Sequence, residues 1–126
     1  MHEVELPVFR GPLDLLLHLV EKRELDITAV SLVAVTDQYL AIIRAKEQID
    51  LSSLSEFIAI GSRLLLIKSR ALLPQPEVPA GEEPPPDEDA EELAELLRQY
   101  REFKRVAAEF RERQEHGLRS YPRLAP

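Results

Sequence analysis

The chain has 126 residues, a formal net charge of −7, 44% hydrophobic residues and no cysteine. The lack of cysteine excludes disulfide frameworks, thiolate zinc sites and cysteine nucleophiles, and it fits a reducing compartment. The sequence has no apolar run of the ~18 residues that a membrane span needs, and its first residues lack the features of a secretory signal. Its acidic balance argues against a general nucleic-acid-binding surface.

Charge divides the chain into three parts. Residues 1–73 hold 8 basic and 10 acidic side chains, residues 74–97 hold no base and 9 acids, and residues 98–126 hold 8 bases and 4 acids. This division predicts a nearly neutral domain, an acidic linker and a basic C-terminal segment.

The first expected helix, residues 12–23, carries more leucine than one apolar face requires. Residues 4–9 precede it as an extended lead-in, and Pro12 suits the first turn of a helix, where its missing N–H is not needed. An amphipathic helix has one apolar stripe, but this one has two. The first stripe is Leu13, Leu16, Leu17 and Val20, and the second is Leu15 and Leu19. We expect one face to pack within the chain and the other to close the small bundle or its interface.

A second helix is expected after a connector at residues 24–28. Ser31 is its predicted N-cap, and it runs to about Lys46. Its apolar stripe has helical spacing and consists of Leu32, Val35, Tyr39, Ile42 and Ile43.

The third expected helix has two apolar seams. Ser53 and Glu56 form a capping box that predicts its start, and Pro74 predicts its end, because the residue before a proline disfavours the α region. Both seams step by threes and fours, as coiled-coil positions do. The first seam is Leu54, Ile58, Gly61, Leu65 and Leu72, and the second is Phe57, Ile60, Leu64, Ile67 and Ala71, with Leu66 outside both.

Residues 74–90 contain six prolines and predict a stiff, acidic, solvated linker. A long amphipathic helix follows at 91–117, where Gly117 is expected to end it, and residues 118–126 are expected to be a disordered tail. The apolar stripe of this helix is Leu93, Leu96, Leu97, Tyr100, Phe103, Ala107 and Phe110, which Val106 widens.

The sequence therefore predicts an all-α fold: a small N-terminal three-helix domain at residues 1–73, the linker, and one long helix. A domain of this size is marginally stable without a staple, so its spare apolar faces are expected to be completed by another protein. The alternative is a self-contained four-helix adaptor or regulatory bundle. The 17-residue linker disfavours it, since bundle connections usually have ~2–8 residues.

No catalytic, phosphate-binding or metal-binding motif is found, so we expect neither an enzyme nor a cofactor. Asp14 and His18 share a helix face, but a zinc site needs at least three protein ligands. Lys68 and Arg70 fit cations that offset a helix dipole, with a specific contact as the alternative. The bases of the long helix favour i, i+4 pairing over weak nucleic-acid binding.

Five short motifs follow one another along the chain: VFRGPLDLLLHLVEK (8–22), LDI (25–27), TDQYL (36–40), LLLIKSRALLP (64–74) and YREFK (100–104). In this order they resemble the bacterial kleisin family of segregation and condensation protein A (ScpA), over nearly all of residues 4–116. The first and fourth motifs are the longest and most specific.

The resemblance implies two protein partners and a cytoplasmic, nucleoid-associated location. In this family the N-terminal helical domain docks on the coiled-coil neck of an SMC protein, and the segment after the linker lies along a dimer of segregation and condensation protein B (ScpB). DNA is then bound only indirectly, through the complex. Carried over, the SMC-neck residues are Tyr39, Ile43, Leu54, Phe57, Ile58, Gly61, Leu64 and Leu65, without a decision as to which seam faces the neck. The ScpB-binding residues are Leu93, Leu96, Leu97, Tyr100, Phe103, Ala107 and Phe110.

One family feature is missing from these 126 residues. The family's C-terminal winged-helix domain, which caps a second SMC head, has no counterpart before Pro126. We therefore expect either a fragment or a chain that does not bridge two heads.

Overall fold

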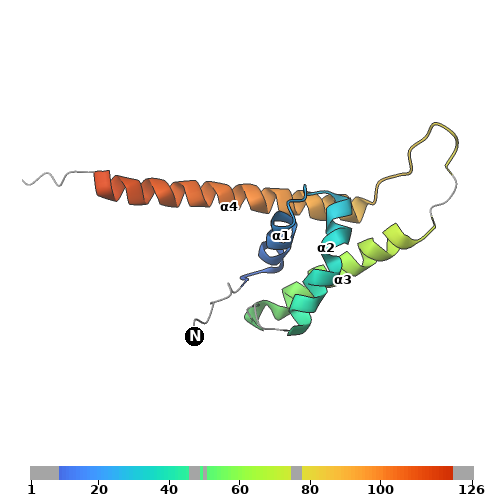
Figure 1. The fold of residues 1–126 in the computed structure, drawn as a ribbon, viewed down its shortest axis with the longest axis horizontal. Helices are drawn as coiled ribbons and strands as arrows, with labels where there is room; N and C mark the ends of the chain where they lie inside the picture. Colours follow the sequence, from blue (N-terminus) through green and yellow to red (C-terminus); the bar gives the residue numbers. More distant parts are fainter. Residues whose placement is uncertain (1–8, 46–48, 50, 75–77, 121–126) are drawn as a thin grey trace, which may run out of the picture.

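The computed structural model describes residues 9–45, 49, 51–74 and 78–120, and its fold is all-α (Figure 1). The helices are α1 (Pro12–Lys22), α2 (Ala29–Ala45), α3 (Leu54–Leu72) and α4 (Glu88–Ser120). A 3₁₀ turn, Leu51–Ser53, leads into α3, and Phe9 pairs with Ile49 in an isolated parallel bridge. Of the predicted extended lead-in at 4–9, residues 4–8 lie outside the described residues.

Helix α1 is central to the fold, and its predicted position is confirmed. Leu15, Leu16, Leu17, Leu19 and Val20 are all buried, because α1 contacts α2, α3 and α4. Both leucine faces are therefore covered by the chain itself.

The N-terminus of α2 lies earlier than predicted. The backbone N–H of Ser31 donates to Thr28 Oγ1 over 3.2 Å, so Thr28 caps the helix and Ser31 lies in its first turn. The Ser31 side chain is buried and its hydroxyl donates to the carbonyl of Asp26. The prediction of Ser31 as the N-cap is therefore wrong. Thr28 and Ser31 are both residue types that favour the N-cap, and the sequence alone does not show at which of them the helix begins. The predicted end at Lys46 lies outside the described residues.

Helices α2 and α3 pack closely where α3 carries its glycine. A Cβ on Gly61 would lie 3.3 Å from Leu40 Cδ2 and 3.4 Å from Tyr39 Cε1. The Tyr39 hydroxyl donates to the carbonyl of Phe57 over 2.8 Å, and the ring is fully buried. Burial raises the pKa of Tyr39 well above its usual value. Tyr39 and Gly61 thus form one packing unit.

Helix α3 begins and ends where the sequence predicts, but its start is capped differently. Ser53 belongs to the 3₁₀ turn, with ψ at 11°, and makes no side-chain cap hydrogen bond. The predicted capping box is therefore wrong, because an N-cap side chain needs extended backbone to reach the third N–H. At the other end Leu73 is extended, as a residue before proline should be.

Helix α4 is longer than predicted at both ends. Asp87 Oδ1 accepts the backbone N–H groups of Asp89 at 3.0 Å and Ala90 at 3.2 Å, so the helix begins at Glu88 rather than 91. It continues through Gly117 to Ser120, where a helix end and a disordered tail were expected. A glycine inside a helix costs about 1 kcal/mol, which a 33-residue helix tolerates three residues from its end. Residues 121–126 of the expected tail lie outside the described residues.

The first turns of α4 pack on the N-terminal helices, contrary to the expectation of a helix separated from them by a tether. Ala90, Leu93, Ala94 and Leu97 are fully buried. Arg98 Nη2 donates to the carbonyl of Ile27 over 2.7 Å. Beyond this docked base, the helix extends away from the other three (Figure 1). The two small alanines allow close approach, and α1 supplies an apolar face that needs a cover.

We predict that Tyr39→Phe lowers the free energy of unfolding by about 1 kcal/mol, because the carbonyl of Phe57 loses a buried donor. Urea denaturation at neutral pH measures this, with Val30→Ala at an exposed position as the control. Unchanged stability of Tyr39→Phe would contradict the prediction.

The pH dependence of the free energy of unfolding gives a second test of Tyr39→Phe. Because Tyr39 has a higher pKa in the folded chain than in the unfolded chain, the unfolded chain loses its proton first. The stabilisation that results from the neutral Tyr39 side chain is fully present below pH ~10, and it is lost as the pH rises above that value. Above pH ~10 the free energy of unfolding of Tyr39→Phe should therefore fall less steeply than that of the wild-type chain, as urea denaturation at several pH values would measure.

Candidate protein-interaction surfaces

Helix α3 presents an outward face that the chain leaves uncovered. Ile58, Leu65 and Leu72 have 52%, 49% and 72% of their surfaces exposed. Ser62 and Ser69, also exposed, lie between them, so the five residues step by four and three along the helix. We call this set the α3 seam. Its spacing is that of the contact positions in a coiled coil.

The serines of the α3 seam make it suitable for close helix packing. Ser62 Oγ donates to the carbonyl of Ile58 over 3.0 Å, so its hydroxyl is satisfied within the helix. Small side chains between large ones create holes into which the side chains of a facing helix can insert.

A second exposed apolar surface lies on α4 beyond its docked base. Phe103, Val106 and Phe110 are 70%, 48% and 62% exposed, and we call them the α4 stripe. Near the base of this stripe, Lys104 Nζ pairs with Asp14 Oδ1 at 2.9 Å. The hydrogen bond to Asp14 raises the pKa of Lys104, which favours the charged form of Lys104, and the contact ties α4 to α1.

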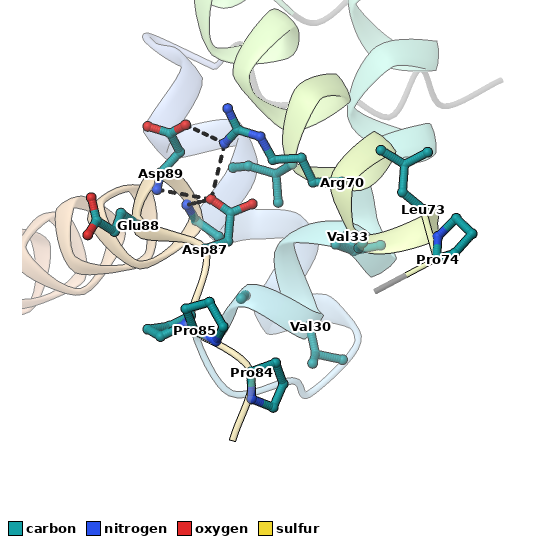
Figure 2. Close-up of a pocket in the computed structure, with 15 residues that line it drawn as sticks. Val30, Val33, Arg70, Leu73, Pro74, Pro84, Pro85, Asp87, Glu88 and Asp89 are labelled. Carbon is teal, nitrogen blue, oxygen red and sulfur yellow. Dashed lines mark hydrogen bonds and ion pairs between the residues drawn. The ribbon is translucent and has the colours of Figure 1, made fainter. Parts of the chain in front are cut away.

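Ion pairs also connect α3 to its neighbours. Figure 2 shows Arg70 reaching from α3 to Asp87 and Asp89 at the start of α4; its Nη1 lies 3.2 Å from Asp87 Oδ1. Lys68 Nζ lies 2.7 Å from Asp37 Oδ1 on α2. Lys68 and Arg70 therefore make specific ion pairs. This is the alternative that the sequence leaves open to the first interpretation, in which they offset the helix dipole.

Arg70, Asp87 and Asp89 are among the residues that line an open cavity of about 810 Å³. Val30, Val33 and Pro84–Pro86 line it with other residues, and the view in Figure 2 looks into it. Within the described residues no group of three or more metal-ligating side chains is found, and no helix there is long and apolar enough to cross a bilayer. The exposed features described above are thus apolar side chains on α3 and α4.

A family model described as segregation and condensation protein ScpA matches residues 19–125. The chain belongs to the ScpA family. It is 43% identical to segregation and condensation protein A of Desulfitobacterium hafniense over 106 residues, which is 82% of this chain and 40% of that relative. It is 38% identical to the protein of the same name from Bacillus subtilis over 122 residues, which is 95% of this chain and 49% of that relative. The chain thus spans less than half the length of these relatives.

The SMC-neck residues that the ScpA resemblance implied are divided between the interior and the surface. Only two of them, Ile58 and Leu65, lie on the α3 seam, while Ile43 and Leu54 are partly buried. The other four are buried inside the chain and are not surface contacts: Tyr39, Phe57, Gly61 and Leu64. The pattern missed Ser62 and Ser69 because only apolar residues were counted, although the four-three spacing of the α3 seam could have revealed them.

The implied ScpB-binding residues are divided in the same way, along the length of α4. Leu93 and Leu97 are fully buried against the N-terminal helices, so they are not available on this surface. Leu96, Tyr100 and Ala107 are at the margin, with Leu96 37% exposed and the other two partly buried. Phe103 and Phe110 are exposed. The apolar stripe that the sequence shows as continuous is therefore buried in the core at its N-terminal end and exposed at its C-terminal end.

We predict that Leu97→Ala lowers the free energy of unfolding by about 2–5 kcal/mol, whereas Phe103→Ala changes it by less than about 0.5 kcal/mol. The reason is that Leu97 is fully buried and Phe103 is exposed, although both belong to one stripe. Urea denaturation followed by circular dichroism measures both. Equal effects of the two substitutions would contradict the division of α4 into a docked base and a free stripe.

Proposed function

We propose that the chain is a non-enzymatic subunit of an SMC complex in bacterial chromosome condensation and segregation. In this proposal it docks on an SMC coiled-coil neck through the α3 seam and on a ScpB dimer through the α4 stripe. Membership of the ScpA family supports the role in condensation and segregation. The cytoplasm and the nucleoid are the corresponding location, and DNA is reached only through the complex.

The observation that carries the SMC contact is the α3 seam. Its three large residues are exposed, although a chain of this size has little apolar surface to spare. The four-three spacing fits the side of another helix, and a coiled-coil neck presents such sides. Leu66, next to the seam, is 48% exposed and widens the apolar contact.

The proposed ScpB contact uses the part of α4 that the bundle leaves free. Phe103 and Phe110 are seven residues apart on one face of the helix, with Val106 between them. Large aromatic side chains near the centre of an interface contribute most of the binding energy in typical complexes. An amphipathic helix of this kind fits an apolar groove on a partner.

We predict that Ile58→Asp combined with Leu65→Asp abolishes binding to an SMC head-plus-neck fragment, because two charges would be buried without partners. Phe110→Asp should abolish binding to ScpB by the same mechanism. Each variant should keep the binding that the other loses, so each serves as the control for the other.

Pull-down and calorimetry with the two purified partners measure these effects. All three positions are exposed, so circular dichroism should show wild-type helix content in both variants. Retained SMC binding by the α3 variant, at unchanged helicity, would reject the α3 seam as the docking surface. If neither partner binds the wild-type chain, the adaptor-bundle alternative gains support.

A further inference from the structure

Two arginines flank the distal end of the α4 stripe on opposite sides. At 100° per residue, Arg111 and Arg113 project about 80° to either side of the direction of Phe103, the first residue of the stripe. Both side chains are exposed. The apolar face of α4 is therefore bordered by a cation on each side near Phe110.

Among the described residues these two cations have no ion pair, like Arg101 on the opposite side of α4 and unlike Arg98, Lys104 and Arg105. Lys104 pairs with Asp14, and Arg105 pairs with Glu102 and, over 3.1 Å, with Glu109. Arg98 lies 3.2 Å from Glu95. Arg111 and Arg113 are thus left free to meet charges on another molecule.

The acidic residues nearby do not cancel this pattern. Glu102 and Glu109 lie on the same side of the stripe as Arg113, but both are already bound to Arg105. Glu112 projects opposite the stripe, and Glu115 forms no ion pair with Arg111 among the contacts of the described residues. Carboxylates of a partner beside the stripe would give the two arginines the ion pairs that they lack among the described residues.

We propose that the α4 stripe docks in an apolar groove of the partner whose two rims carry carboxylates, one opposite Arg111 and one opposite Arg113. The inference rests on the proposed function, because it takes ScpB as that partner. Charges at the rim of an interface act mainly on the association rate and its salt dependence. Phe103 and Phe110 would then contribute most of the binding affinity. Arg111 and Arg113 would raise the association rate and fix the position of α4 along the groove.

The test measures association of the full chain with immobilised ScpB at low and high salt. Arg111→Glu with Arg113→Glu should slow association by about tenfold at low salt and remove most of the salt dependence. The double glutamine variant should give an intermediate rate. Arg101→Glu is the control on the same helix: it makes the same charge reversal as each of the two substitutions but projects nearly opposite the stripe, so its rate should stay within about twofold of wild type.

The rim inference is overturned if the double reversal binds like wild type, or if Arg101→Glu slows association equally. Phe110→Asp separates this failure from failure of the proposed function. Loss of ScpB binding in Phe110→Asp but not in the double reversal rejects the rims alone, whereas unchanged binding in both rejects the α4 stripe as the ScpB site. A dimer of the chain alone that Phe110→Asp dissociates, measured by light scattering, would assign the stripe to a second copy and overturn the proposal.

Discussion

The fold depends on the contact between α1 and the base of α4. Without it, α1 would expose a row of leucines in a three-helix domain that has little core to spare. Leu93 and Leu97 at the base of α4, which contacts α1, α2 and α3, are fully buried, and burial of a leucine side chain is worth roughly 1.5–3 kcal/mol. The contribution is comparable to the whole net stability of many small domains, so the base of α4 is part of the domain although a long linker precedes it.

Docking the base of α4 sets the relation between the two exposed surfaces. An α-helix rises 1.5 Å per residue, so the part of α4 beyond residue 100 extends roughly 30 Å from the bundle in a fixed direction. The bond from Arg98 to the carbonyl of Ile27 and the ion pair of Lys104 with Asp14 resist rotation of α4 about its own axis. The α3 seam and the α4 stripe are then presented by one body rather than by two bodies on a tether. A complex assembled on this chain would inherit that geometry.

Local signals in the sequence predicted the helices well, and long-range contacts account for most of the errors. Pro12 and Pro74 fixed the limits of α1 and α3 because proline acts on its immediate neighbours. Leu93 and Phe103 obey the same spacing, and only what lies opposite each of them makes one core and the other surface. The interior position of Tyr39 likewise depends on the close approach that Gly61 allows, which no pattern within α2 reveals.

The central claim is that α4 consists of a docked base and a free distal half, and hydrogen exchange of the unliganded chain tests it most directly. Amides in residues 91–100 should be protected to a similar degree as those in residues 57–67 of α3, because both segments open only when the core opens. Amides in residues 104–116 should exchange far faster, since they are held by an isolated helix alone. Equally fast exchange throughout α4, with α3 protected, would contradict the account and make α4 an undocked helix on a tether.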